Sequence, residues 1–129
     1  MTGWGRLSVN QADRIEFIAA HVKCAAALEQ LAEEAAELTH AALKYARIIR
    51  GDNPTPVTPE EAHKALIEEM ADVILVARVL MNQGVSFDNK TIGERKARRW
   101  VDRIREEEAR KNGADDVPIQ PKGGADATD

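Results

Sequence analysis

The sequence has little cysteine and no long apolar run. Cys24 is the only cysteine in the chain, which excludes an internal disulfide and any cysteine-rich zinc site. No stretch reaches the roughly 18 uninterrupted apolar residues that a membrane span needs, and the N-terminal MTGWGRLSVN lacks the apolar core of a secretory signal. With a net charge of −4 and a pI near 5.4, general attraction to nucleic acid or to an anionic membrane is not expected. These absences predict a cytoplasmic protein with no nucleic-acid partner and no membrane partner.

Glycine and proline are missing from a long segment near the N-terminus. Residues 7–50 contain neither and are rich in Ala, Leu and Glu, all of which favour helix. Asn10 followed by Asp13 is a candidate helix start, and the apolar residues keep helical spacing throughout. Because this segment is longer than a typical globular helix, we expect a break within residues 21–24, although no residue there marks it.

Gly51 and a group of prolines divide the rest of the chain. Gly51 is predicted to end the first helical region, and it opens the loop GDNPTPVTPEE. The end of this loop indicates a capping box that begins at Thr58, with proline at the first helical position. One helix is predicted from there to about residue 83, where Gly84 follows, and a last helix over residues 91–111.

No segment has the alternating pattern of a strand, and no internal repeat is present. The predicted fold is therefore all-α, a compact bundle of about four helices. We expect residues 1–9 to be an N-terminal extension and residues 10–111 to be the helical domain. Residues 112–129 are polar, contain Gly and Pro and lack an apolar period, which predicts a disordered tail.

Acidic residues gather beside the predicted core. The segment EQLAEEAAEL carries Glu34 and Glu37 on one flank of its apolar stripe, whereas Glu33 points farther from the core. The next helix carries EEMADVIL, with Glu69 and Asp72 on the matching flank. Both pairs have the spacing that places two side chains on neighbouring turns of one face. A carboxylate cluster near a core needs water, a basic neighbour or a metal ion to balance its charge.

The predicted hairpin brings the two acidic pairs to one level. If the loop over residues 51–58 closes an antiparallel hairpin, Glu37 faces Asp72, and Glu34 and Glu69 lie within about one helical turn of them. Four carboxylates held this close would repel and raise one another's pKa. An all-oxygen cluster of this kind favours Mg²⁺, with Mn²⁺ as a substitute. The alternative is an acidic helix face that is simply solvated.

Two Glu-x-x-His motifs suggest a different metal chemistry, the di-iron centre of ferritin-like bundles. They begin at Glu37 and Glu60. The hairpin register separates the two motifs by about 18 Å along the helix axis, so they cannot share one di-iron centre. We therefore expect the histidines to be surface or packing residues.

Three motifs in order along the chain resemble one known family. EEAAE, then EMAD on the next helix, and then KARRW on the last helix resemble the signature of MazG-like nucleoside triphosphate pyrophosphohydrolases, in the all-α NTP pyrophosphatase superfamily. The resemblance covers roughly residues 10–107. The spacing between Glu37 and Glu69 is long for the family, and Glu94 precedes the basic stretch, near which the family often has Asn.

The resemblance implies Mg²⁺-dependent hydrolysis of an NTP or dNTP to the monophosphate and pyrophosphate by a homodimer or homotetramer. It also implies a role for individual residues. Glu33 would hold a second ion or activate water, and Lys96 and Arg99 would contact the phosphates. The metal ligands that it implies are Glu34, Glu37, Glu69 and Asp72.

The basic residues of the last helix have two interpretations. Lys96, Arg99 and Arg103 form a flank beside apolar residues, where they would stabilise a pyrophosphate leaving group. The alternative is a solvated basic face. Two other functions stay open at this point: a non-catalytic helical interaction module of the same fold, and a related pyrophosphatase that acts on phosphoribosyl-ATP.

Overall fold

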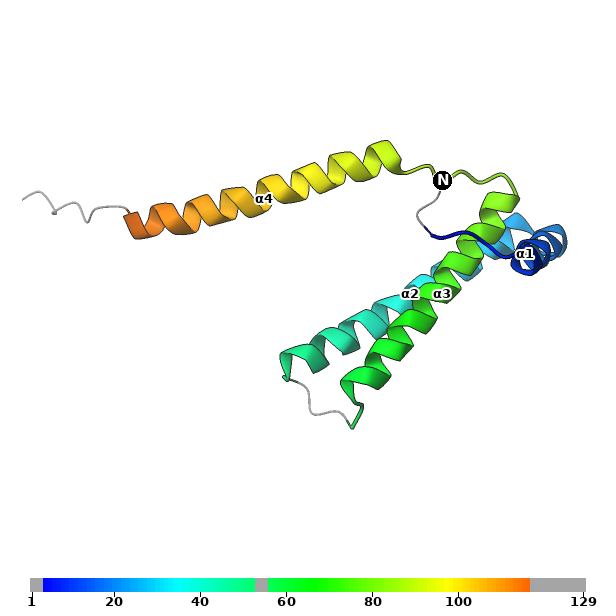
Figure 1. Cartoon of the computed structure of the whole chain (residues 1–129), viewed down its shortest axis with the longest axis horizontal. Helices are drawn as coiled ribbons and strands as arrows, with labels where there is room; N and C mark the ends of the chain where they lie inside the picture. The colour runs from blue at the N-terminus through cyan, green and yellow to red at the C-terminus, as the bar shows by residue number, and fades with distance from the viewer. Residues whose placement is uncertain (1–3, 53–55, 117–129) are drawn as a thin grey trace, which may run out of the picture. The chain divides into compact units, whose positions relative to one another are not determined.

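The computed structural model describes residues 4–52 and 56–116, and over these residues the chain is helical, with no strand (Figure 1). The predicted all-α class is confirmed. Of the predicted tail, residues 117–129 lie outside the described residues. The four described helices are α1 (Val9–His21), α2 (Cys24–Arg50), α3 (Pro59–Asn82) and α4 (Lys90–Asp116).

Most helix ends agree with the sequence-based predictions. The break between α1 and α2 falls at residues 22–23, as expected. The start of α1 differs from the prediction, because Ser8 and not Asn10 caps it: the Ser8 Oγ accepts a hydrogen bond from the Gln11 backbone N–H at 3.2 Å. At the other end of the chain, α4 continues to Asp116 and does not end near residue 111.

The connection between α2 and α3 is fixed at both ends by local hydrogen bonds. Gly51 ends α2 at a φ of 73°, in the left-handed region that favours glycine. The predicted capping box begins α3: the Thr58 Oγ1 accepts from the Glu61 N–H at 3.2 Å, and the Glu61 carboxylate accepts from the Thr58 N–H at 3.1 Å. Together these caps stop and restart the chain where the hairpin must turn.

The core lies where α2 begins and α3 ends. These two helices run side by side as a hairpin, and α1 packs against α3 (Figure 1). Ile15 of α1, Ala27 of α2 and the pair Val79 and Leu80 of α3 form the buried cluster. Helical spacing brings one or two small or branched side chains from each of these helices to this point. The rest of the hairpin extends away from the core, and the acidic residues of α2 and α3 lie along that part.

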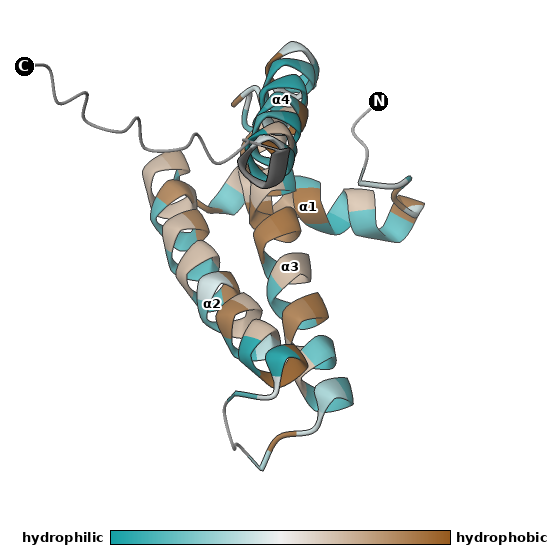
Figure 2. Cartoon of the chain, turned by 90° about the vertical axis from the view of Figure 1, so that its left-hand side faces the viewer, coloured by the Kyte–Doolittle hydropathy of each residue, from teal (hydrophilic) through white to brown (hydrophobic). Residues whose placement is uncertain are grey.

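The chain divides into two compact units after Asp88. The first contains α1, α2 and α3, and the second contains α4. Every side chain described in α4 is exposed, and the helix is mostly hydrophilic (Figure 2). Its exposed apolar residues include Trp100, which is 70% exposed, and Ile104. None of the four helices, over the described residues, is both long enough and apolar enough to cross a bilayer.

Candidate metal centre

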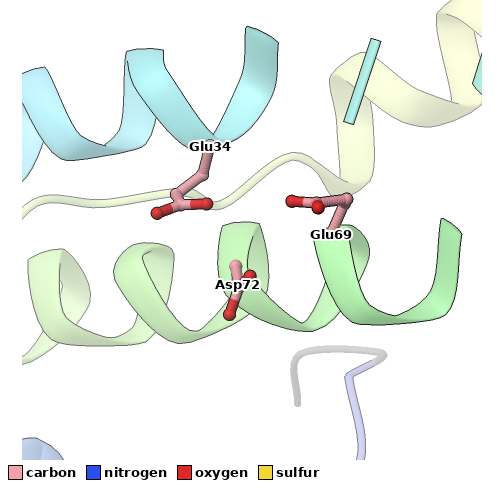
Figure 3. A group of neighbouring side chains, drawn as sticks. All are labelled: Glu34, Glu69 and Asp72. Carbon is pink, nitrogen blue, oxygen red and sulfur yellow. The ribbon is translucent and has the colours of Figure 1, made fainter. Parts of the chain in front are cut away.

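Three carboxylates converge between the two helices of the hairpin. Glu34 extends from α2, and Glu69 and Asp72 lie one turn apart on α3 (Figure 3). One carboxylate oxygen from each residue lies within 4.8 Å of the others. Glu34 and Glu69 are half-buried and Asp72 is exposed. Two neighbouring helices therefore direct three negative charges to one point at the edge of the hairpin.

A neighbouring amide orients one of these carboxylates. The Gln30 Nε2 donates a hydrogen bond to the Glu34 Oε1 at 2.6 Å. The two residues are four apart on α2, so their side chains lie on one face. No role for Gln30 was predicted from the sequence. The four-residue spacing was the signal for that role, because amide–carboxyl pairs at this spacing are common helix-surface partners.

The three carboxylates have no cationic partner in the part of the chain that the structure describes. Over the described residues, ion pairs join Arg50 to Asp52 and Glu107 to Lys111, and none involves the cluster. Partial burial raises the pKa of Glu69, and the neighbouring carboxylates raise it further: Asp72 first, then Glu37, Glu34 and Glu68. The folded protein therefore favours a proton, or an added cation, at this point.

The raised pKa predicts a pH dependence of stability in the metal-free protein. As pH rises from the ordinary glutamate value of 4.5 through the raised value, the folded state still holds a proton that the unfolded state has released. The free energy of unfolding should therefore fall across this window. Glu69→Gln should remove this contribution, and Glu29→Gln, an exposed site on the same hairpin, should retain it. Urea unfolding of both variants and the parent in EDTA across this window measures the difference. A parallel decline in all three proteins would contradict the prediction.

The geometry and chemistry of the three carboxylates fit a hard divalent cation. Octahedral ligand oxygens lie 2.0–2.1 Å from Mg²⁺, so they are about 3 Å apart at adjacent positions and about 4 Å apart at opposite ones. The three oxygens lie within 4.8 Å of one another, and side-chain rotation would bring them to these distances. Mg²⁺ also keeps several waters, and the exposure of Asp72 leaves room for them. Glu34, Glu69 and Asp72 would hold the ion.

The structure brings together three of the four predicted ligands and places the fourth beside them. The carboxylate of Glu37 lies outside the close group, although its charge contributes to the raised pKa of Glu69. The sequence-based register paired Glu37 with Asp72, and in the structure Glu34, one turn earlier on α2, joins Asp72. Glu33 is exposed, in keeping with its predicted direction away from the core.

The predicted phosphate-contacting residues lie on a different element. Lys96 and Arg99 are exposed residues of α4, and so belong to the second compact unit. Six of the eleven residues from 95 to 105 are Lys or Arg. At about 100° per residue, Lys96, Arg99 and Arg103 share one side of α4, and Arg105 lies on the opposite side. The helix therefore has a basic flank of defined residues.

The histidines have surroundings other than the carboxylate cluster. His40 and His63 are both exposed. The ring of His63 lies against that of Tyr45, with centroids 5.6 Å apart. This contact agrees with a packing role for His63.

Comparison of the chain with protein-family models, with curated proteins and with solved structures found no match in any of the three. The resemblance to the MazG-like family therefore rests on the acidic and basic motifs alone.

Proposed function

We propose that this protein is a Mg²⁺-dependent nucleoside triphosphate pyrophosphohydrolase. It would convert an NTP or dNTP and water to the monophosphate and pyrophosphate, acting in the cytoplasm on the nucleotide pool. The observation that supports the proposal is the convergence of Glu34, Glu69 and Asp72 within 4.8 Å, with no cationic partner among the described residues. The order of the EEAAE, EMAD and KARRW motifs, the first two of which contain these carboxylates, adds support from the sequence.

The proposed chemistry needs charge neutralisation and positioning more than a covalent group from the protein. When bound, Mg²⁺ or Mn²⁺ would supply a Lewis acid for the phosphate oxygens and would lower the pKa of a bound water. Glu34, Glu69 and Asp72 would hold the ion, and the Gln30 amide keeps Glu34 oriented toward it. Glu33 and Glu37, exposed on the same helix, would accept the proton of the attacking water or assist a second ion.

We propose that the basic flank of α4 acts on the phosphates of the substrate. A pyrophosphate leaving group carries negative charge that grows as the bond to the α-phosphorus breaks. Lys96 and Arg99 present positive charge on one side of an exposed helix, and Arg is well suited to bind phosphate through two parallel hydrogen bonds. In this proposal these side chains bind the β- and γ-phosphates and stabilise the departing pyrophosphate.

A nucleotide panel tests the activity directly. Pyrophosphate release is measured from ribo- and deoxyribonucleoside triphosphates and from phosphoribosyl-ATP, each in Mg²⁺ and in EDTA. The proposal expects metal-dependent release of pyrophosphate and monophosphate in equal amounts from at least one nucleoside triphosphate. Release from phosphoribosyl-ATP alone would identify the related pyrophosphatase. No release from any substrate would favour the non-catalytic interaction module.

We also expect the protein to form a homodimer or homotetramer. Ile67 and Met70 of α3 and Leu28 and Leu43 of α2 are all at least 44% exposed. Two helices cannot cover all of one another's apolar faces, and pairing with a second copy would bury these side chains. Light scattering at micromolar concentration should give at least twice the chain mass of 14.2 kDa. A monomer of that mass would contradict this prediction.

A further inference from the structure

A cavity lies on the first compact unit, away from the carboxylates. Its volume is about 500 Å³, and it lies between the N-terminal segment, α1 and α3. Arg6, Arg14 and Arg78 line it together with Trp4. Most of the remaining wall is apolar and comes from Leu7 and from residues of α1 and α3. The cavity therefore combines several positive charges with a nonpolar surface.

This cavity is separate from the candidate metal centre. On α3 it is lined by Ala71, Ile74, Leu75 and Arg78, which recur at the spacing of one helix face. Glu69 and Asp72 form a different face, about 140° around the helix at 100° per residue. A ligand in the cavity would therefore contact a side of α3 other than the one that carries the acidic cluster.

Arg78 builds one wall of the cavity. Its guanidinium donates hydrogen bonds to the backbone carbonyls of Trp4 and, at 3.4 Å, of Gly5. These bonds tie the N-terminal segment to α3 across more than seventy residues of sequence. The segment is therefore held in place as the wall that carries Trp4 and Arg6.

Among the described residues, the other two arginines have no protein partner. Neither Arg6 nor Arg14 makes a hydrogen bond or an ion pair there, and no described carboxylate lies within 4.0 Å of any of the three guanidinium groups. Both arginines are exposed, so an anion from solvent can reach them. Three like charges around one cavity repel unless an anion joins them.

We propose that this cavity binds a small organic phosphate that carries a planar or apolar group. Guanidinium groups match the oxygens of a phosphate through parallel hydrogen bonds, and three of them balance a phosphate dianion better than a carboxylate monoanion. Trp4 and the apolar wall supply a surface for a ring or a short hydrocarbon group. A volume of about 500 Å³ lies within the usual range for sites of small ligands.

Calorimetry on the full-length protein, in EDTA and at low salt, tests this proposal with phenyl phosphate as the probe. Three further probes each change one feature. Inorganic phosphate lacks the ring, benzoate has a carboxylate monoanion in place of the phosphate, and phenol has the ring without the phosphate. Phenyl phosphate should bind most tightly, inorganic phosphate and benzoate more weakly, and phenol not measurably. Binding should weaken as salt is added. Equal binding of phenol and phenyl phosphate, or no binding of phenyl phosphate, would overturn the proposal.

Matched substitutions locate the site. Arg14→Gln and Arg6→Gln should each weaken phenyl phosphate binding by about tenfold or more, the usual effect of losing a hydrogen bond to a charged group. Arg6 precedes the first helix, so its replacement leaves every helix intact. Arg47→Gln removes the same charge at an exposed position near the far end of α2 and should leave binding unchanged. Equal effects of all three substitutions would show that only net charge matters, and the proposal would fail.

One further variant separates this site from the proposed activity. Glu69→Gln should bind phenyl phosphate as the parent does, since Glu69 lies on the other face of α3. Loss of binding in this variant would place the phosphate at the acidic cluster and overturn the proposal. Loss of pyrophosphate release with binding retained would support two independent sites.

Discussion

Replacing Glu69 by Gln is expected to abolish metal-dependent pyrophosphate release and, in the same variant, to raise the melting temperature of the metal-free protein. The loss of activity should be at least about 10²-fold, because even outer partners of metal ligands can cost 10- to 100-fold. The gain in stability follows from the raised pKa of Glu69. Near neutral pH the charged carboxylate of Glu69 is repelled by four neighbouring carboxylates. A neutral amide of the same shape removes this repulsion.

The two effects are measured separately. Pyrophosphate release is followed at saturating Mg²⁺, and thermal unfolding is followed in EDTA and again in Mg²⁺. Glu29→Gln makes the same chemical change at an exposed position of α2 and should alter neither quantity. If Glu69→Gln hydrolyses nucleotides as fast as the parent, the carboxylates are not the site of the reaction. If Mg²⁺ fails to raise the melting temperature of the parent, the carboxylates do not hold the ion.

Local signals in the sequence were enough to place most of the helix ends. The capping box at Thr58 and the left-handed Gly51 both depend on short-range chemistry, and both were predicted. The cap at Ser8 was missed although its signal is also local, because Asn10 and Asp13 offered a competing start. Gln11 follows Ser8 by three residues, as Glu61 follows Thr58, with an amide side chain in place of a carboxylate.

The break between α1 and α2 is stabilised by a residue distant in sequence, so no local sequence signal marks it. Gln83, just beyond α3, donates hydrogen bonds to the backbone carbonyls of Ala19 at 3.1 Å and of Val22 at 2.6 Å. These carbonyls lie at the end of α1, where a helix leaves acceptors without partners. A side chain more than sixty residues away thus compensates the interruption. Helix length alone indicated that a break was needed, and only the fold shows what stabilises it.

The candidate site shows the same limit. Residue spacing predicted correctly that one flank of α2 and one flank of α3 carry carboxylates, because a helix face is a local property. The pairing across the hairpin was predicted from a loop that joins the helices at equal height. The connection is long enough for an offset, and a glutamate side chain reaches across part of a turn. Glu34, rather than Glu37, therefore joins Asp72 in the close group.

Contacts distant in sequence account for the remaining features. The bond from Arg78 to the N-terminal segment builds the arginine-lined cavity, and nothing in residues 1–9 indicated that it would be a wall of a cavity. Likewise, the apolar residues of α4 predicted a helix with an apolar face, and α4 falls in the second of the two compact units. Periodicity shows that a helix has an apolar face, but it does not say what covers that face.

A substitution in the basic flank of α4 is also expected to reduce pyrophosphate release strongly. Lys96→Ala should slow pyrophosphate release by about 10²- to 10³-fold at saturating Mg²⁺, the range found when one preorganised electrostatic contact to a developing charge is removed. The reason is that Lys96 would stabilise the pyrophosphate as it leaves, when its charge is greatest. The substitution replaces one exposed residue with the best helix former, so the melting temperature should not fall.

Arg105→Ala is the matched control, because it removes one positive charge from the same helix on the side opposite Lys96. If α4 acted only through its net charge, both variants would lose activity to the same degree, and both losses would disappear at high salt. A specific contact predicts instead a large loss in Lys96→Ala, little change in Arg105→Ala, and Mg²⁺ stabilisation unchanged in both. Unchanged stabilisation by Mg²⁺ would separate metal binding from phosphate contact, since Mg²⁺ would be held by the carboxylates of the hairpin and not by α4. Full activity in Lys96→Ala would remove this residue from the site and leave the three carboxylates to be tested alone.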